Sequence, residues 1–114
     1  MKKLALTFSL LITAISLFSQ NQSEFRAVWI ATVDNIDWPT KGNYNSDSQK
    51  QEFIRILDMH QRNGINAVIA QIRPATDAFY PSPYEPWSEW LTGKQGTAPV
   101  PYYDPLQFMI EETH

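Results

Sequence analysis

The residues of this chain that are best suited to chemistry fall in two clusters, and each cluster mixes carboxylates with aromatic side chains. The first cluster holds Asp34, Asp37 and Trp38. The second cluster adds a cation, and its members are Arg73, Asp77, Tyr80, Glu85, Trp87, Glu89 and Trp90. The flat apolar face of a pyranose stacks on aromatic rings, while carboxylates and arginine hydrogen-bond its hydroxyl groups. The two clusters therefore indicate a sugar-binding cleft.

Cleavage of a glycosidic bond needs two carboxyl groups, an acid and a nucleophile or base, about 5 to 9.5 Å apart. Neither cluster identifies such a pair, so the residues themselves leave the catalytic acid and nucleophile unknown. Other roles stay open for the polar residues. Asp34 and Asp37 have the side chains that cap turns. Arg73 can bind substrate, or it can pair with Asp77 to brace its loop.

Composition excludes several other kinds of site. The 12 acidic residues outnumber the 9 Lys and Arg, the formal net charge is -3, and there is no basic stretch. Binding to nucleic acid is therefore not expected, because phosphate contacts need clustered cations. The chain has no Cys, which excludes disulfides, thiolate metal sites and a Cys nucleophile. We also find no His, Asp or Glu spacing typical of a metal site.

Two apolar segments rich in β-branched residues precede the clusters, at residues 25–33 and 67–72. Each is typical of a strand buried on both faces, so Trp29 is expected in the core or the lining of a barrel. A helix is predicted from a capping box at Ser46 and Gln49 to a stop at residues 63–64. Strand, helix and strand in this order predict a parallel pair. Both clusters then follow the carboxyl ends of the strands.

The remaining residues begin a second strand-to-helix unit. Residues 73–104 show no clear periodicity and hold six of the eight prolines. A connection this long is uncommon in a compact domain and is usually functional or disordered; its aromatic content favours a functional role. A second helix is predicted to begin with Asp104 as N-cap and Pro105 in the first helical position.

Two parallel strands with one complete helix do not make a closed domain, because buried strands need neighbours on both sides. We therefore expect an α/β protein in which this chain supplies the first two βα units of a (β/α)8 TIM barrel, incomplete in these 114 residues. A doubly wound sheet is the structural alternative, but neither strand is followed by a G-x-G-x-x-G or P-loop motif.

The N-terminus predicts export. Lys2 and Lys3 precede an apolar run that extends to Phe18, as in a signal peptide. We assign residues 1–19 to this peptide and residues 20–114 to the start of the barrel domain. The run is short for a membrane span of about 20 residues, so no stable span is expected after cleavage. The expected location is the periplasm, the cell surface or the extracellular space of a bacterium.

Several blocks of sequence carry a specific resemblance to a known family. They cover residues 24–33, 37–39, 64–68, 71–80, 85–88, 91–93 and 103–106, together with Gly96. In these blocks the chain resembles the glycosyl-hydrolase-like family ten domain of bacterial exported proteins. One departure is Thr76, because relatives often have Gly before Asp77.

The resemblance implies a (β/α)8 barrel that hydrolyses glycosidic bonds of a cell-surface or cell-wall polysaccharide and requires no cofactor. It also implies a set of substrate-binding residues: Arg73, Asp77, Tyr80 and Trp87, with Asp37 and Trp38 less directly. The family domain is considerably longer than this match, so the resemblance implies that the catalytic acid and nucleophile lie beyond His114. Two alternatives therefore stay open: a non-catalytic glycan-binding protein, and an inactive product of a truncated reading frame.

Overall fold

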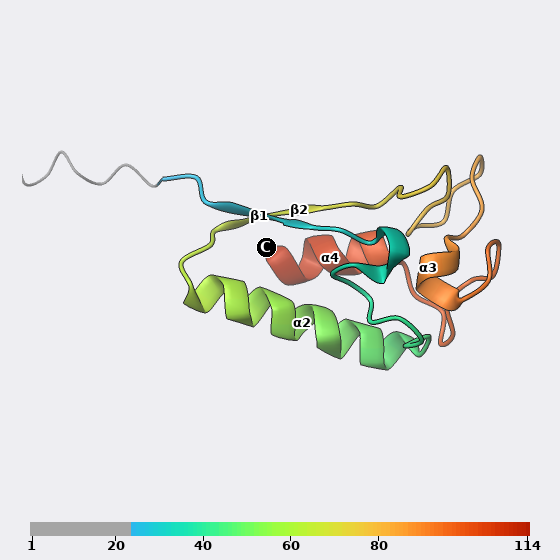
Figure 1. The fold of residues 1–114 in the computed structure, drawn as a ribbon, viewed down its shortest axis with the longest axis horizontal. Coiled ribbons are helices and arrows are strands. Elements are labelled where there is room, and N and C mark those ends of the chain that lie inside the picture. Colours follow the sequence, from blue (N-terminus) through green and yellow to red (C-terminus); the bar gives the residue numbers. More distant parts are fainter. Residues whose placement is uncertain (1–23) are drawn as a thin grey trace, which may run out of the picture.

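The computed structural model describes residues 24–114 of the chain, which form a mixed α/β unit (Figure 1). In chain order its elements are β1 (Ala27–Ile30), the 3-10 turn η1 (Val33–Asn35), α2 (Ser46–Arg62), β2 (Ala67–Ala70), α3 (Glu89–Thr92) and α4 (Pro105–Thr113). The predicted signal peptide, residues 1–19, lies outside the described residues. Within the described residues, no helix has the length and apolarity needed to cross a membrane.

The two strands form a parallel pair, and α2 connects them. Ala27 lies opposite Ala67, and the register continues to Ile30 opposite Ala70. The predicted strand, helix and parallel strand are thus confirmed. In this arrangement the loops that follow β1 and β2 leave the sheet at the same end.

Both strands are shorter than the apolar segments that predicted them, because side chains take over the backbone partners of a ladder. The N–H of Ala31 donates to Oδ2 of Asp37 at 2.7 Å. The N–H groups of Thr32 and Val33 both donate to Oε1 of Gln71, at 3.0 and 3.1 Å. Because side chains satisfy these donors, the N–H groups after Ile30 need no partner strand, and the chain turns away from the strand direction.

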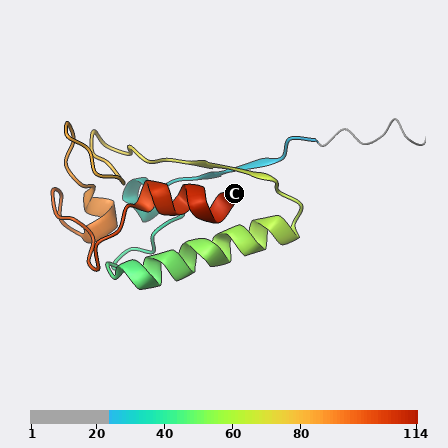
Figure 2. The same ribbon diagram turned by 180° about the vertical axis from the view of Figure 1, so that it is seen from behind.

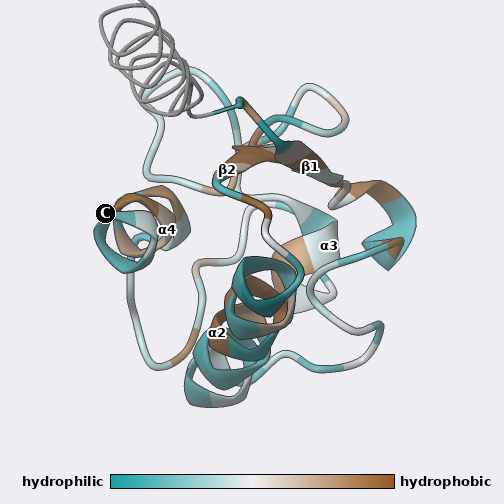
Figure 3. Ribbon diagram, turned by 90° about the vertical axis from the view of Figure 1, so that its left-hand side faces the viewer, coloured by the Kyte–Doolittle hydropathy of each residue, from teal (hydrophilic) through white to brown (hydrophobic). Residues whose placement is uncertain are grey.

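The two faces of the sheet differ in what covers them. Both α2 and α4 lie on the same side of the strands (Figures 1 and 2), and Figure 3, an end-on view, shows the two helices below the sheet. Val28 and Ile30 point toward the helices, whereas Trp29 and Ile69 alternate to the other face and are 57% and 46% exposed. The sequence predicted strands buried on both faces; among residues 24–114 only one face is covered.

The helix-facing side of the sheet packs into a core that is rich in aromatic residues. Its buried members are Ile30, Trp38, Phe53, Phe79, Leu91 and Met109. The ring of Trp38 meets Phe53 edge-on, with centroids 5.4 Å apart, and lies 5.9 Å from the ring of Phe79. The core therefore joins the loop after β1, helix α2 and the loop after β2.

The start of α2 differs from the predicted capping box. Its N-cap is Asn45, whose Oδ1 accepts from the N–H of Ser48 at 3.0 Å. Ser46 instead donates its hydroxyl to the carbonyl of Pro101 at 2.5 Å, and Gln49 is fully buried. The prediction was wrong because both side chains find partners in segments that are distant in sequence.

The end of α2 is as predicted. The N–H of Gly64 donates to the carbonyl of Gln61 at 2.9 Å, and that of Ile65 reaches back to His60 at 3.0 Å. Gly64 has a φ of +79°, so this is a Schellman motif that closes the helix.

Helix α4 also begins where the sequence predicted. Asp104 is its N-cap, and its Oδ1 accepts from the N–H of Gln107 at 3.1 Å. Pro105 occupies the first turn, where a missing N–H costs nothing.

The long connection between β2 and α4 is ordered and contains α3, which the sequence did not reveal. Ser88 caps this helix by accepting from the N–H of Trp90 at 3.3 Å, and Gly93 ends it with a φ of +79°. A Cβ atom on Gly93 would lie 2.6 Å from the ring of Tyr44, so the turn and the close packing both require glycine. A helix of four residues is too short to show periodicity.

One buried amide, that of Gln49, connects α2 to three other segments. Its Nε2 donates to the carbonyls of Asn43 and Leu91, each at 2.7 Å. Its Oε1 accepts from the hydroxyl of Tyr103 at 3.0 Å, and burial raises the pKa of that hydroxyl. Its main-chain carbonyl accepts from Nε1 of Trp38 at 2.9 Å. The connection before α2, helix α3 and the segment before α4 are thus joined at one residue.

Replacing Gln49 with Ala should lower the free energy of unfolding by about 3 kcal/mol or more, because two carbonyls and a buried hydroxyl lose their partners. Urea denaturation of the expressed protein measures this loss. Gln51→Ala, an exposed site on the same helix, is the matched control and should change stability by no more than about 0.5 kcal/mol. Equal effects of the two variants would contradict the role assigned to Gln49.

Thr76 is held in a backbone conformation that suits glycine. Its φ is +55°, a region that is costly for a β-branched residue. Thr76→Gly should therefore raise the free energy of unfolding by up to about 1 kcal/mol, the strain relieved being partly offset by the larger entropy of glycine in the unfolded chain. The thermal unfolding midpoint measures this gain. Unchanged or lower stability would show that the strain at Thr76 does not exceed the entropic cost of glycine in the unfolded chain.

Candidate functional site

The two predicted clusters meet at one end of the sheet. The loop after β1 and the loop after β2 both lie at the end where α3 is found (Figure 1). The side chain of Asn35 joins them, because its Nδ2 donates to the carbonyl of Pro39 at 2.9 Å and to that of Trp90 at 2.7 Å. The structure thus brings together the residues that the sequence singled out on either side of α2.

In the first cluster the polar and aromatic side chains shape the loop. Oδ2 of Asp37 accepts from the N–H of Ala31 and so closes the turn after β1. Trp38 has no exposed surface, and its ring packs on Phe53. Trp38 therefore belongs to the core, and its ring is not presented to a ligand.

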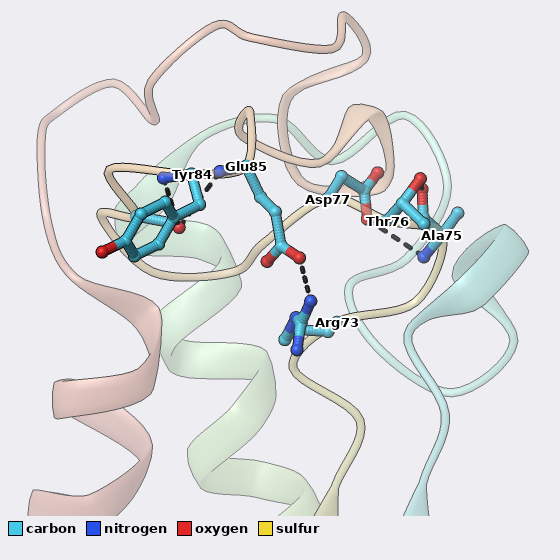
Figure 4. Close-up of polar contacts among 7 residues, drawn as sticks. Arg73, Ala75, Thr76, Asp77, Tyr84 and Glu85 are labelled. Carbon is cyan, nitrogen blue, oxygen red and sulfur yellow. Dashed lines mark hydrogen bonds and ion pairs between the residues drawn. The ribbon is translucent and has the colours of Figure 1, made fainter.

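Asp77 lies at the bend of the second loop and is almost fully buried, with 1% of its surface exposed. Its Oδ1 accepts from the N–H of Ala75 at 3.1 Å (Figure 4). The brace that the sequence suggested between Asp77 and Arg73 is not formed; the partner of Arg73 is Glu85. The carboxylate of Asp77 therefore shapes the segment next to Thr76, where the backbone has its positive φ.

Arg73 and Glu85 form an ion pair across the second loop (Figure 4). Nη2 of Arg73 donates to Oε1 of Glu85. The side chain of Arg73 is 57% exposed, whereas that of Glu85 is 17% exposed. Sequence reasoning placed Glu85 in the cluster but not among the substrate-binding residues, since no local pattern joins residues twelve positions apart.

The connection between β2 and α4, which carries this ion pair, also carries aromatic side chains. Tyr80 and Trp87 are each partly exposed. The ring of Trp87 meets that of Tyr102 edge-on, with centroids 6.2 Å apart, and Tyr102 is 66% exposed. Tyr102 was not singled out from the sequence; its alternation with the buried Tyr103 was the available signal. The connection between β2 and α4 therefore carries partly exposed aromatic side chains as well as the charged pair.

The arrangement suits the binding of a polar ligand with apolar faces. Arginine offers several N–H donors, the carboxylate of Glu85 accepts, and the aromatic rings offer flat apolar surface. Among residues 24–114, no group of three His, Asp or Glu side chains is placed to hold a metal ion.

Comparison with known proteins gives a consistent result over the described residues. Residues 24–114 match the family described as glycosyl hydrolase-like 10. The chain is 62% identical over 96 residues to the glycosyl hydrolase YngK of Bacillus subtilis, an alignment that covers 84% of this chain and 18% of the relative. It is 42% identical over 102 residues to the glycosyl hydrolase DigH of Escherichia coli K12, covering 83% of this chain and 23% of the relative.

The chain therefore spans about a fifth of the length of these curated relatives. The family match covers both strands, both long helices and the loops that carry the ion pair and the aromatic residues. It also agrees with the resemblance drawn from the sequence blocks. This chain belongs to the glycosyl hydrolase-like 10 family.

Proposed function

We propose that these residues are the N-terminal part of an exported glycoside hydrolase that cleaves a cell-surface or cell-wall polysaccharide. The observation that carries this proposal is the position of the ion pair between Arg73 and Glu85. It lies in the loop that leaves the carboxyl end of β2, and the partly exposed Trp87 belongs to the same loop. In parallel α/β folds, this end of the sheet is where ligands bind.

We further propose that the complete domain is a (β/α)8 barrel. The exposed face with Trp29 and Ile69 would then become the barrel interior, because that interior is filled by apolar side chains from the strands. The much greater length of the relatives supports additional βα units. Hydrolysis by paired carboxylates would draw its acid and nucleophile from those units, as we identify neither among the described residues.

Within this cleft the predicted residues would divide into two groups. Arg73, Tyr80 and Trp87 have exposed surface and would contact the sugar, the first through its N–H groups and the others through their rings. Asp37, Trp38 and Asp77 would act on the cleft indirectly. Their side chains hold the backbone of the two loops.

The full-length protein encoded by the gene that contains these residues should release reducing ends from at least one glycan in a panel of bacterial cell-wall and surface polysaccharides. A reducing-sugar assay measures this directly, and the 114-residue chain alone serves as the matched control without the proposed catalytic units. Binding of a glycan without product release would favour the glycan-binding alternative. If the full-length protein neither bound nor cleaved any glycan of the panel, the proposal would be contradicted.

Arg73→Ala should lower kcat/KM of that reaction by about 10- to 100-fold, since a hydrogen bond from a charged donor is worth about 1.5–3 kcal/mol. Steady-state kinetics on the cleaved glycan provide the measurement. Arg55→Ala, which removes an exposed arginine in the middle of α2, should leave kcat/KM unchanged. Wild-type kinetics for a folded Arg73→Ala variant would remove Arg73 from the cleft.

A further inference from the structure

The ion pair between Arg73 and Glu85 is held at two anchored points of the loop after β2. Arg73 follows Ile72, whose carbonyl accepts from the N–H of Phe79 at 3.0 Å. Glu85 precedes Pro86, whose carbonyl accepts from the N–H of Ala78 at 2.9 Å. Both members of the pair therefore project from backbone that is already fixed by main-chain hydrogen bonds.

The backbone around Glu85 is fixed on its other side as well. The hydroxyl of Ser82 accepts from the N–H of Tyr84 at 3.2 Å and from that of Glu85 at 3.1 Å (Figure 4). The N–H of Ser88 donates to the carbonyl of Ala78 at 3.0 Å. The loop thus keeps its shape through contacts in which the side chains of the ion pair take no part.

The ion pair itself adds little to folding. With the side chain of Arg73 57% exposed, the pair belongs to the class of surface salt bridges, which typically contribute about 0–1 kcal/mol. Glu85 is much less exposed, at 17%, so its carboxylate has little freedom to move. Arg73 therefore pairs with it in one orientation. The physical effect of Glu85 is therefore on the orientation and charge of Arg73 rather than on stability.

That effect decides what Arg73 can bind. A guanidinium has five N–H donors in a planar fork, and only Nη2 donates to Glu85. The exposed donors remain available to a ligand, while the carboxylate of Glu85 cancels the positive charge beside them. Two further carboxylates lie in the loops at this end of the sheet: Asp37 in the loop after β1 and Asp77 in the loop after β2. A negatively charged ligand group gains little attraction there, whereas hydroxyl and amide oxygens can accept from the guanidinium.

We infer that Glu85 is a positioning and specificity residue: it holds Arg73 and cancels its charge, so that the sugar unit bound at this point is uncharged. This inference rests on the proposed function and adds the chemical class of the sugar in one subsite. The ligand atoms that meet Arg73 are hydroxyl or N-acetyl carbonyl oxygens. The carboxylate of an acidic sugar is rejected.

The test compares two probes on the full-length protein. One is the β-1,4-linked tetramer of N-acetylglucosamine, and the other is its anionic 6-O-carboxymethyl derivative. Affinities come from titration calorimetry at low and high salt. We expect the wild type to prefer the neutral tetramer. Glu85→Gln should weaken binding of the neutral tetramer and tighten binding of the anionic one by about tenfold, a gain that high salt removes.

Two further variants separate this role from a structural one. Glu85→Asp keeps the negative charge and should keep the neutral preference, although with weaker binding because the shorter side chain reaches Arg73 less well. Glu24→Gln removes the comparable ion pair with Arg26 at the opposite end of β1, and should change neither affinity. Thermal unfolding of Glu85→Gln should nearly match the wild type, since an ion pair whose arginine is largely exposed contributes only about 0–1 kcal/mol.

Three results would overturn the inference: a wild type that prefers the anionic tetramer, a wild type that binds neither tetramer, and a Glu85→Gln variant whose preference is unchanged. If the wild type still releases reducing ends from the polysaccharide panel, the proposed function stands while the inference about Glu85 fails. If it releases none, both fail.

Discussion

The arrangement of the loops depends on the need to satisfy polar groups that are buried at the N-terminus of α2. An unpaired buried carbonyl or N–H costs about 1–3 kcal/mol, and four segments converge here. The side chain of Gln49 satisfies three of these groups, by donating to two carbonyls and accepting from Tyr103. Its main-chain carbonyl also receives the indole N–H of Trp38. An apolar side chain of similar size would fill the space but leave the two carbonyls and the hydroxyl of Tyr103 without partners.

This constraint reaches the candidate site through the core. Gln49 holds Leu91 and Trp38, and both pack in the same cluster as Phe79. Phe79 lies between the buried Asp77 and the exposed part of the loop, and its N–H returns to Ile72 beside Arg73. Gln49 therefore does not contact the ion pair, yet through the core it fixes the backbone from which Arg73 extends. Placement on such a supported segment favours binding, because little ordering remains to be done when a ligand arrives.

Sequence patterns were sufficient where the physics is local. The Schellman end of α2 and the Asp104 cap of α4 each involve residues within a few positions of one another, so composition and spacing predicted them. The N-cap of α2 was placed one residue late, because Ser46 bonds to Pro101, 55 positions away. The pairing of Glu85 with Arg73 and the burial of Trp38 were not predicted for the same reason. Whether a carboxylate meets Arg73, or an indole enters the core, depends on contacts between distant segments, and no local pattern contains that information.

The contrast between the two faces of the sheet bears on the family's architecture. On the helix side, Ile30 is buried by α2 and α4; on the other side, Trp29 and Ile69 remain largely exposed and lie opposite each other in register. A solvated face of an antiparallel sheet normally carries polar residues, whereas parallel sheets are apolar on both faces because both are covered. The composition of the two strands is thus typical of a parallel sheet that is covered on both faces. The alignments cover only 18% and 23% of the relatives, which therefore have the additional chain to provide it. The ion pair at the strand ends would then stand at the rim of a closed barrel, where a ligand reaches it from solvent.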